Sequence, residues 1–174
     1  MKTILVPTDL STESISIVHK ALQHSREHKV EIILLHLVQP VHDIGDLLRS
    51  SKRRFYSQLP QAFCEAVQVL KKCYLEQAHI RFEICYCNTG RVFRHILESN
   101  HITEIYLLNG YSYQTPFKES IRMDQYIAAS RLPVFKIDRY KQLHVSKDIN
   151  LLSNLLLMPE FRKDRQYAKE ETVS

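Results

Sequence analysis

The chain has 174 residues, of which 44% are hydrophobic and 25% are charged, so it is long enough for a sizeable core and is not a disordered chain. Its 3 glycines and 6 prolines exclude a collagenous or low-complexity sequence. The net charge of +5 is only mildly basic, and a nucleic-acid partner is not expected from it. No apolar run approaches the roughly 18–20 residues of a membrane span, and the first residues lack a signal peptide's apolar stretch. The expectation is a cytoplasmic protein without a membrane partner.

The first half of the chain predicts two strands and two helices. Apolar runs at residues 3–7 and 30–38 predict strands buried on both faces. Between them, a group of capping residues predicts a helix from Ser11 to about residue 28. Pro60 begins a second helix with strict helical spacing of its apolar positions.

A basic cluster precedes Pro60, and it consists of Arg49, Lys52, Arg53 and Arg54. We interpret it as a solvated loop and helix start in preference to an anion-binding patch, because no aromatic-rich basic strand accompanies it. Nucleic-acid binding through this cluster is retained as a lesser hypothesis, and a steep salt dependence would be its signature.

The second half continues the alternation of strands and helices. Apolar and polar residues alternate over residues 80–87, which predicts a half-exposed strand at a sheet edge. The remaining predicted elements are a short helix opening at Gly90, a strand at residues 104–109, a weaker helix at residues 118–130 and a strand at residues 133–137.

This pattern predicts an α/β fold with a five-stranded parallel sheet in the order 3-2-1-4-5 and helices on both faces. Ligands of such sheets bind where the strand order reverses, beyond the carboxyl ends of the strands. Here that crevice lies between the first and fourth strands. The residues predicted to line or flank it are Pro7, Thr8, Asp9, Leu37, Val38, Asn109 and Gly110.

The last part of the chain leaves this pattern, so we divide the sequence into an α/β domain at residues 1–138 and an extension at residues 139–174. Within the extension, an amphipathic helix is predicted by Ile149, Leu152, Leu155, Leu156 and Met158. A charged tail follows it. The apolar face of this helix packs either on its own domain or on a partner.

Several of these segments together resemble the universal stress protein family. The matching segments are residues 4–11 (ILVPTDLS), 33–38 (ILLHLV), 102–110 (ITEIYLLNG) and 129–134 (ASRLPV). The resemblance covers about residues 1–138 and implies a UspA-like domain that forms a homodimer through its last strand. Some members of the family bind ATP or AMP. In those members, residues matching Asp9 and Leu37 or Val38 contact the adenosine, and a glycine-rich loop beginning at the match to Gly110 holds the phosphates.

The chain departs from the family's loop pattern G-x2-G-x9-G-[S/T] after Gly110. Tyr113, Met123 and Asp124 occupy the positions of the second glycine, the third glycine and the hydroxyl residue. Glycines allow backbone amides to approach phosphate oxygens, whereas Tyr113 introduces a ring and Asp124 a negative charge. Lys118 offers a positive charge only through its side chain. We therefore expect a degenerate phosphate loop and no bound cofactor.

Individual residues allow more than one interpretation. Asp9 either contacts a ribose or base, or caps the first helix. His36 is interpreted as a core histidine in preference to a catalytic base. The sequence contains no nucleophile elbow, no phosphate-binding P-loop and no four-residue metal box, so no catalytic or metal residues are predicted.

Two functional hypotheses follow. The first is a homodimeric, non-enzymatic stress-response protein that docks to other proteins, in part through its C-terminal helix, and whose nucleotide cleft is vestigial. The alternative is a nucleotide-binding switch or weak ATPase that takes ATP or AMP in a modified pocket. That pocket would use Asp9, Asn109, Gly110 and Lys118.

Overall fold

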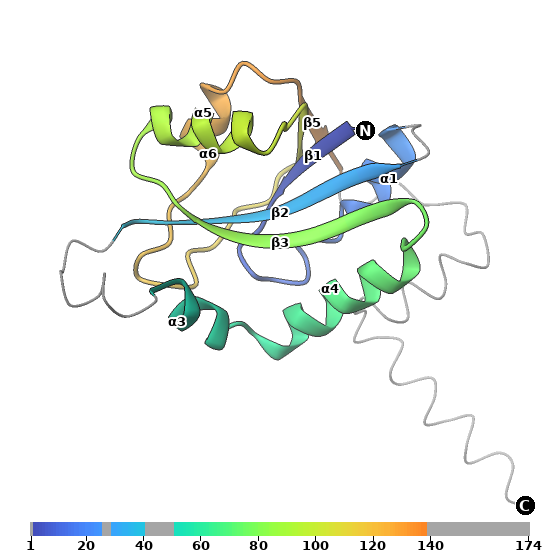
Figure 1. The fold of residues 1–174 in the computed structure, drawn as a ribbon, viewed down its shortest axis with the longest axis horizontal. Coiled ribbons are helices and arrows are strands. Elements are labelled where there is room, and N and C mark those ends of the chain that lie inside the picture. The colour runs from blue at the N-terminus through green and yellow to red at the C-terminus, as the bar shows by residue number, and fades with distance from the viewer. Residues whose placement is uncertain (1, 26–28, 41–50, 139–174) are drawn as a thin grey trace, which may run out of the picture. The chain divides into compact units, whose positions relative to one another are not determined.

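The computed structural model describes residues 2–25, 29–40 and 51–138, which form a sheet with helices on both faces (Figure 1). The sheet has five strands, all parallel, in the order β3-β2-β1-β4-β5, and this confirms the predicted order. The strands are β1 (Lys2–Pro7), β2 (Val30–Val38), β3 (Ala78–Tyr86), β4 (Glu104–Leu108) and β5 (Val134–Ile137).

The central strands are buried on both faces, as their uninterrupted apolar runs predict. Residues 32–38 of β2 are all buried, and β1 is buried from Thr3 to Pro7. The registers of these strands place Ile4 beside Ile32 and Ile32 beside Ile80. The edge strand β3 is less buried: only Ala78, Ile80 and Ile84 are buried, and most of its other residues are half-exposed, as expected of an edge strand.

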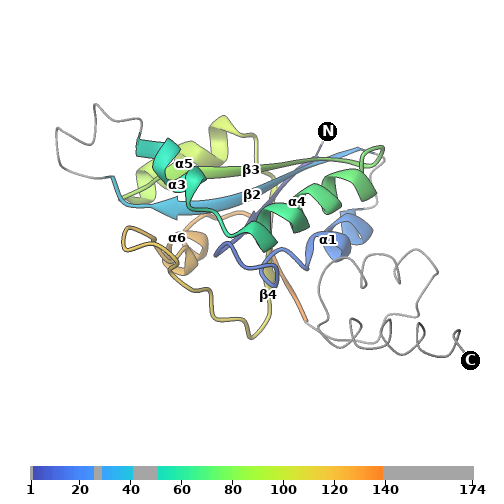
Figure 2. The same cartoon turned by 90° about the horizontal axis from the view of Figure 1, so that it is seen from below.

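The helices are α1 (Val18–Ser25), α3 (Ser51–Ser57), α4 (Gln61–Cys73), α5 (Gly90–Ser99) and α6 (Asp124–Ala128). Figures 1 and 2 show α4 on the face of the sheet opposite α5 and α6. In the described ranges, no helix has the length and apolar character that crossing a membrane requires.

Successive side chains of β2 point to opposite faces of the sheet. Leu35 and Leu37 belong to the core beneath α5 and α6, together with Phe93 and Ile127. Val38 belongs to a separate apolar cluster with Phe55 of α3 and Ile84 of β3. The end of β2 is therefore covered from both faces.

Two helical predictions need correction. α1 begins at Val18 and not at Ser11, because the residues before it form turns in which Ser16 bonds back to the carbonyl of Glu13 through both its amide and its hydroxyl. The predicted end of this helix near residue 28 lies outside the described residues. The helix α3 was not predicted, and it contains the described part of the basic cluster, Lys52 to Arg54.

Candidate functional site

The turn after β1 brings Thr8 and Asp9 to the crevice between β1 and β4. Thr8 Oγ1 accepts a hydrogen bond from the Leu10 amide at 3.0 Å and lies 2.7 Å from Ser14 Oγ. Ser11 Oγ in turn accepts the Ser14 amide at 3.0 Å, which is a capping contact for the turns that follow. These contacts fix the direction of the Asp9 side chain, which is 4% exposed.

Four hydrogen bonds end on the Asp9 carboxylate. Its Oδ1 accepts from the amide of Ser11 at 3.1 Å and from the Ser11 hydroxyl at 2.6 Å. Its Oδ2 accepts from the hydroxyl of Tyr111 at 2.8 Å and from the amide of Gln114 at 2.9 Å, donors that lie 102 and 105 positions away in the sequence. The carboxylate therefore caps its own turn and also holds the loop that follows β4.

The same contacts determine the charge of Asp9. Burial acts to raise the pKa of Asp9, but the hydrogen bonds from Gln114, Ser11 and Tyr111 outweigh it and hold the pKa below its ordinary value. Burial raises the pKa of Tyr111 to about 12, so its hydroxyl keeps its proton at neutral pH and can donate it to the carboxylate.

Tyr113 completes the closure of the loop at residues 109–123. Its hydroxyl accepts the Leu108 amide at 3.3 Å, and its ring meets the Tyr111 ring edge to face with centroids 4.9 Å apart. The two rings thus pack against each other directly after β4.

Several amides of this loop donate hydrogen bonds within the chain. Tyr111 donates to Leu108 O, Gln114 to Asp9, Phe117 to Ser120 Oγ, Ser120 to Phe117 O and Ile121 to Leu37 O. An amide bonded in this way is not free to point at a bound phosphate.

The second half of the loop lies along the carboxyl end of β2. Ser120 forms an antiparallel bridge with Val38, and the Gln39 amide donates to the Glu119 carbonyl at 2.7 Å. This pairing explains a correction to the prediction: α6 begins at Asp124, because the residues expected to form its first turns, from Lys118 on, extend beside β2.

His36 anchors this segment from inside the sheet. Its Nδ1 lies 2.7 Å from the Thr8 carbonyl and its Nε2 lies 2.9 Å from Ser120 Oγ. A carbonyl only accepts, so Nδ1 carries the proton and the Nε2 of the neutral ring accepts from the serine hydroxyl. Burial lowers the pKa of His36, although the Thr8 contact and the charge of Asp9 act in the opposite direction. The interpretation of His36 as a core histidine agrees with this geometry.

The structure brings together only part of the predicted site. Leu37 and Val38 are 0% exposed, since the core beneath α5 and the α3 cluster cover them. Asn109 is exposed and donates to the Asp138 carboxylate at 2.6 Å, at the end of β5.

The other predicted residues remain close to the strand ends. Pro7 is buried at the end of β1, Lys118 is exposed, and Gly110 is exposed with a φ of 67°. Sequence analysis missed the hydrogen bonds of Ser11, Tyr111 and Gln114 to Asp9 and the contact of Ser120 with His36. The two tyrosines were visible only as departures from the expected glycine loop.

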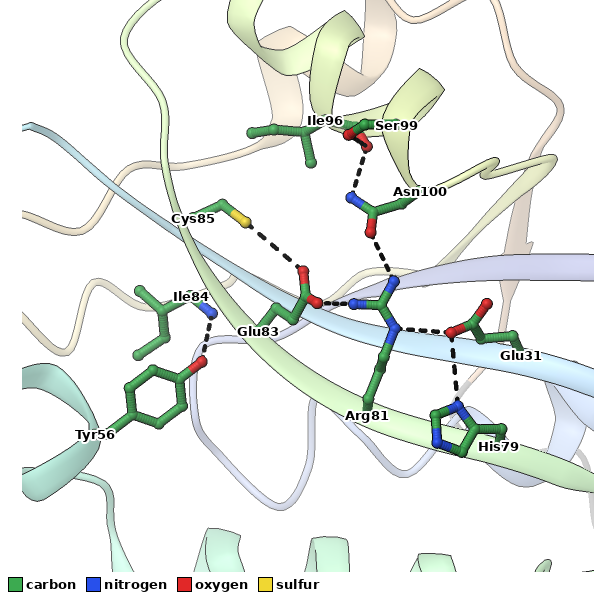
Figure 3. Close-up of polar contacts among 10 residues, drawn as sticks. All are labelled: Glu31, Tyr56, His79, Arg81, Glu83, Ile84, Cys85, Ile96, Ser99 and Asn100. Atoms are coloured by element: carbon green, nitrogen blue, oxygen red, sulfur yellow. Dashed lines mark hydrogen bonds and ion pairs between the residues drawn. The ribbon is translucent and has the colours of Figure 1, made fainter. Parts of the chain in front are cut away.

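A second polar cluster lies at the edge of the sheet and joins β2, β3 and the end of α5 (Figure 3). Arg81 Nε donates to Glu31 at 2.8 Å, Arg81 Nη2 donates to the Asn100 side chain at 2.6 Å, and the guanidinium also pairs with Glu83. Asn100 in turn donates to the Ile96 carbonyl at 2.8 Å. The cluster fixes α5 to the sheet. The described part of the chain has no group of His, Cys, Asp and Glu residues suited to a metal ion.

The strand order and the helices on both faces define a doubly wound α/β domain. Residues 1–84 match the model of the universal stress protein family. This match confirms the family resemblance over residues 1–84.

Solved structures give the same architecture. The universal stress protein UspA from Lactobacillus plantarum is 15% identical, with a TM-score of 0.52 over 78% of this chain and 97% of that one. The hypothetical protein MJ0577, the subject of a structure-based assignment of biochemical function, is 18% identical, with a TM-score of 0.55 over 81% and 98%. At these identities the likeness concerns the fold. None of the curated proteins matches the chain.

Proposed function

We infer that this chain is a non-enzymatic, homodimeric member of the universal stress protein family that acts by binding other proteins. The observation that carries this proposal is the Asp9 carboxylate, whose Oδ2 is occupied by Tyr111 and Gln114 of the chain's own loop. The residue that would contact an adenosine in the nucleotide-binding relatives is thus engaged internally, and the loop amides Phe117 and Ile121 are also bonded within the chain. The cleft is closed and takes no nucleotide.

A specific observation favours the alternative, a nucleotide-binding switch or weak ATPase. Asp9 still stands at the end of β1, Gly110 still adopts a left-handed conformation after β4, and Lys118 is exposed. Under this hypothesis, ATP or AMP displaces Tyr111 and Gln114 from Asp9. Breaking those hydrogen bonds costs free energy and makes the net free energy of nucleotide binding less favourable.

Calorimetric titration separates the two proposals. With ATP-Mg and with AMP, we expect no saturable heat and no co-purified nucleotide, because a ligand must first break the contacts between Asp9 and the loop. A dissociation constant below about 10 μM, equivalent to about −7 kcal/mol, supports the switch and contradicts the closed cleft. A Tyr111→Ala variant serves as the control, since removing the ring opens the cleft without changing Asp9.

The proposed dimer uses the free edge of β5. In the described part of the chain, β5 pairs only with β4, so its other edge is open, and Val134 is 38% exposed. An open strand edge with apolar side chains is a natural surface for pairing with a second copy.

We expect Val134→Lys to weaken self-association at least tenfold, because a charge at a strand edge opposes edge-to-edge pairing. Light scattering after size exclusion is expected to give twice the chain mass of 20.5 kDa for the wild type and a shift toward 20.5 kDa for the variant. Leu75→Lys is the matched control, because Leu75 is 79% exposed and lies in the turn between α4 and β3. Equal masses for both variants would remove β5 as the interface.

The predicted docking role of the C-terminal helix concerns residues 139–174, which lie outside the described residues. The division of the chain at residue 138 and the assignment of partners to that extension therefore stay predictions. A cytoplasmic location is likewise part of the proposal.

A further inference from the structure

The outer face of α5 carries a mainly basic stripe, and no carboxylate among the described residues pairs with its arginines. Residues 91, 94, 95 and 98 follow the spacing i, i+3, i+4 and i+7, which places them on one side of the helix. The opposite side, with Phe93, Ile96 and Leu97, is buried in the core. A shallow, open pocket of about 550 Å³ lies against the outer side, and the described residues that line it are Arg91, Val92, Arg94, His95 and Glu98. We call this surface the α5 groove.

Some arginines of the domain pair with carboxylates, and others, including Arg53 and Arg131, have no such pair among the described residues. Arg54, Arg81 and Arg122 each lie within salt-bridge distance of a carboxylate. Arg91 and Arg94 have no such partner in the part of the chain that the structure describes. Two neighbouring guanidinium groups on this face therefore remain available to a carboxylate from another molecule.

Stability of the helix does not account for these charges. The first turn of α5 contains no acidic residue and does contain Arg91, so a positive side chain lies at the positive end of the helix dipole. Such an arrangement is unfavourable for the isolated domain and becomes favourable when an anionic group binds. The Arg81 cluster holds the other end of α5 through Asn100, so the groove is presented on a fixed helix (Figure 3).

We propose that the α5 groove binds an acidic segment of a partner protein. This inference rests on the proposed function, since it names a surface and a partner chemistry for a protein that acts by binding others. Guanidinium forks match carboxylates in geometry as well as charge. Glu98 at one end of the groove leaves Arg91 and Arg94 as its two fixed positive charges, which match the few carboxylates of a short acidic segment better than the long run of phosphates of a nucleic acid.

The length of α5 determines the length of the test peptide. A helix of 10 residues is about 15 Å long, and an extended peptide of about five or six residues covers that length. We therefore choose a fluorescein-labelled peptide of about six glutamates and measure its anisotropy with the full-length protein at low salt.

The test compares two double variants that each remove two positive charges. Arg91→Ala/Arg94→Ala changes the α5 groove, and Lys52→Ala/Arg53→Ala changes exposed residues of α3. We expect the groove variant to bind the peptide at least tenfold more weakly than the wild type, and the α3 variant to stay within twofold of it. Circular dichroism and urea unfolding confirm that both variants are folded.

Three results overturn the proposal. An equal loss in both double variants shows a response to net charge alone. The absence of saturable binding up to about 1 mM shows that the groove takes no acidic peptide. Tighter, Arg91-dependent binding of an oligothymidylate of equal charge shows a nucleic-acid surface instead. The nucleotide titration described above tests the cleft and not the α5 groove. If the protein binds a nucleotide and the groove variant still binds the peptide more weakly than the wild type, the closed cleft is wrong and the α5 groove proposal is supported.

Discussion

Replacing Asp9 with alanine is expected to lower the free energy of unfolding by about 3 kcal/mol, because four hydrogen bonds end on its carboxylate and two of them hold the distant loop. The variant leaves the Gln114 amide without its acceptor, and the Tyr111 hydroxyl keeps only its contact with Ser11 Oγ at 2.9 Å among the described bonds. Urea denaturation at neutral pH measures the loss. A double-mutant cycle with Tyr111→Phe is expected to give a coupling free energy of about 1 kcal/mol.

Asp124→Ala provides the matched control for this prediction. Asp124 is also an aspartate with a defined partner, since it pairs with Arg122 at 3.0 Å, but both side chains are more than half exposed. An exposed pair of this kind contributes less than about 1 kcal/mol. If Asp9→Ala costs no more than this control, Asp9 serves only as a local cap and the loop is held by other contacts.

The pH dependence of Asp9 follows from the same contacts. Its pKa in the folded state lies below the ordinary value of 3.8, so the unfolded chain takes up a proton first as the solution is acidified. The stability contributed by Asp9 is therefore present above the ordinary pKa of 3.8 and is lost as pH falls through the lower pKa of the folded state. The Asp9→Ala variant lacks this loss.

The sheet was predictable because its information is local. Strands buried on both faces give continuous apolar runs, which β1 and β2 display, and the alternating pattern of residues 80–87 indicated an edge strand. Together with the right-handed crossover rule, these patterns leave few orders for the sheet. The order was therefore accessible before any contact was known.

The closure of the site was not predictable, because it depends on contacts between distant residues. The sequence placed Asp9 beside the loop after β4, but the partners Tyr111 and Gln114 lie more than 100 positions away. The early residues of the predicted α6 helix have apolar side chains at acceptable spacing, yet Ser120 and its neighbours pair with the end of β2 instead. Non-local pairing of this kind overrides a weak helical pattern.

Leu37 and Val38 also show that contacts between distant residues could not be predicted from the sequence. The resemblance placed them beside a base, as residues at the end of the second strand. In the structure, each is sealed by an apolar cluster that includes residues of α3 or α5, and α3 itself was not predicted. A residue's position along a strand indicates its neighbours within the sheet, but the helices above and below decide whether a ligand can reach it.

His36→Asn is expected to reduce the free energy of unfolding by about 2 kcal/mol near pH 7.5, because a buried side chain that is 2% exposed loses one of its two hydrogen bonds. The asparagine amide can still donate to Thr8, but it is too short to reach Ser120. The released segment carries Lys118 and Arg122, so trypsin is expected to cleave the variant there faster than the wild type. Urea unfolding and peptide mass mapping measure the two effects.

The wild type is also expected to lose stability as pH falls from about 7.5 to about 5. Burial holds the pKa of His36 below its ordinary value of 6.5, so the unfolded chain binds the proton first and stability is lost as pH falls below that value. Protonation also turns Nε2 from an acceptor into a donor, and the Ser120 hydroxyl then needs a new acceptor. His36→Asn does not titrate, and its stability is expected to change less over this range.

His19→Asn is the control that separates the effect of the His36–Ser120 contact on the loop from the effect of removing any buried histidine. Burial and the neighbouring Lys20 also lower the pKa of His19, so His19 adds to the acid sensitivity with the same sign. His19 contacts Tyr74 and not the loop. Both variants should flatten the pH dependence, but only His36→Asn should expose Lys118 to trypsin. Equal cleavage of the two variants, or an unchanged pH dependence in His36→Asn, would show that His36 is a packed core residue that does not stabilise the loop at residues 109–123.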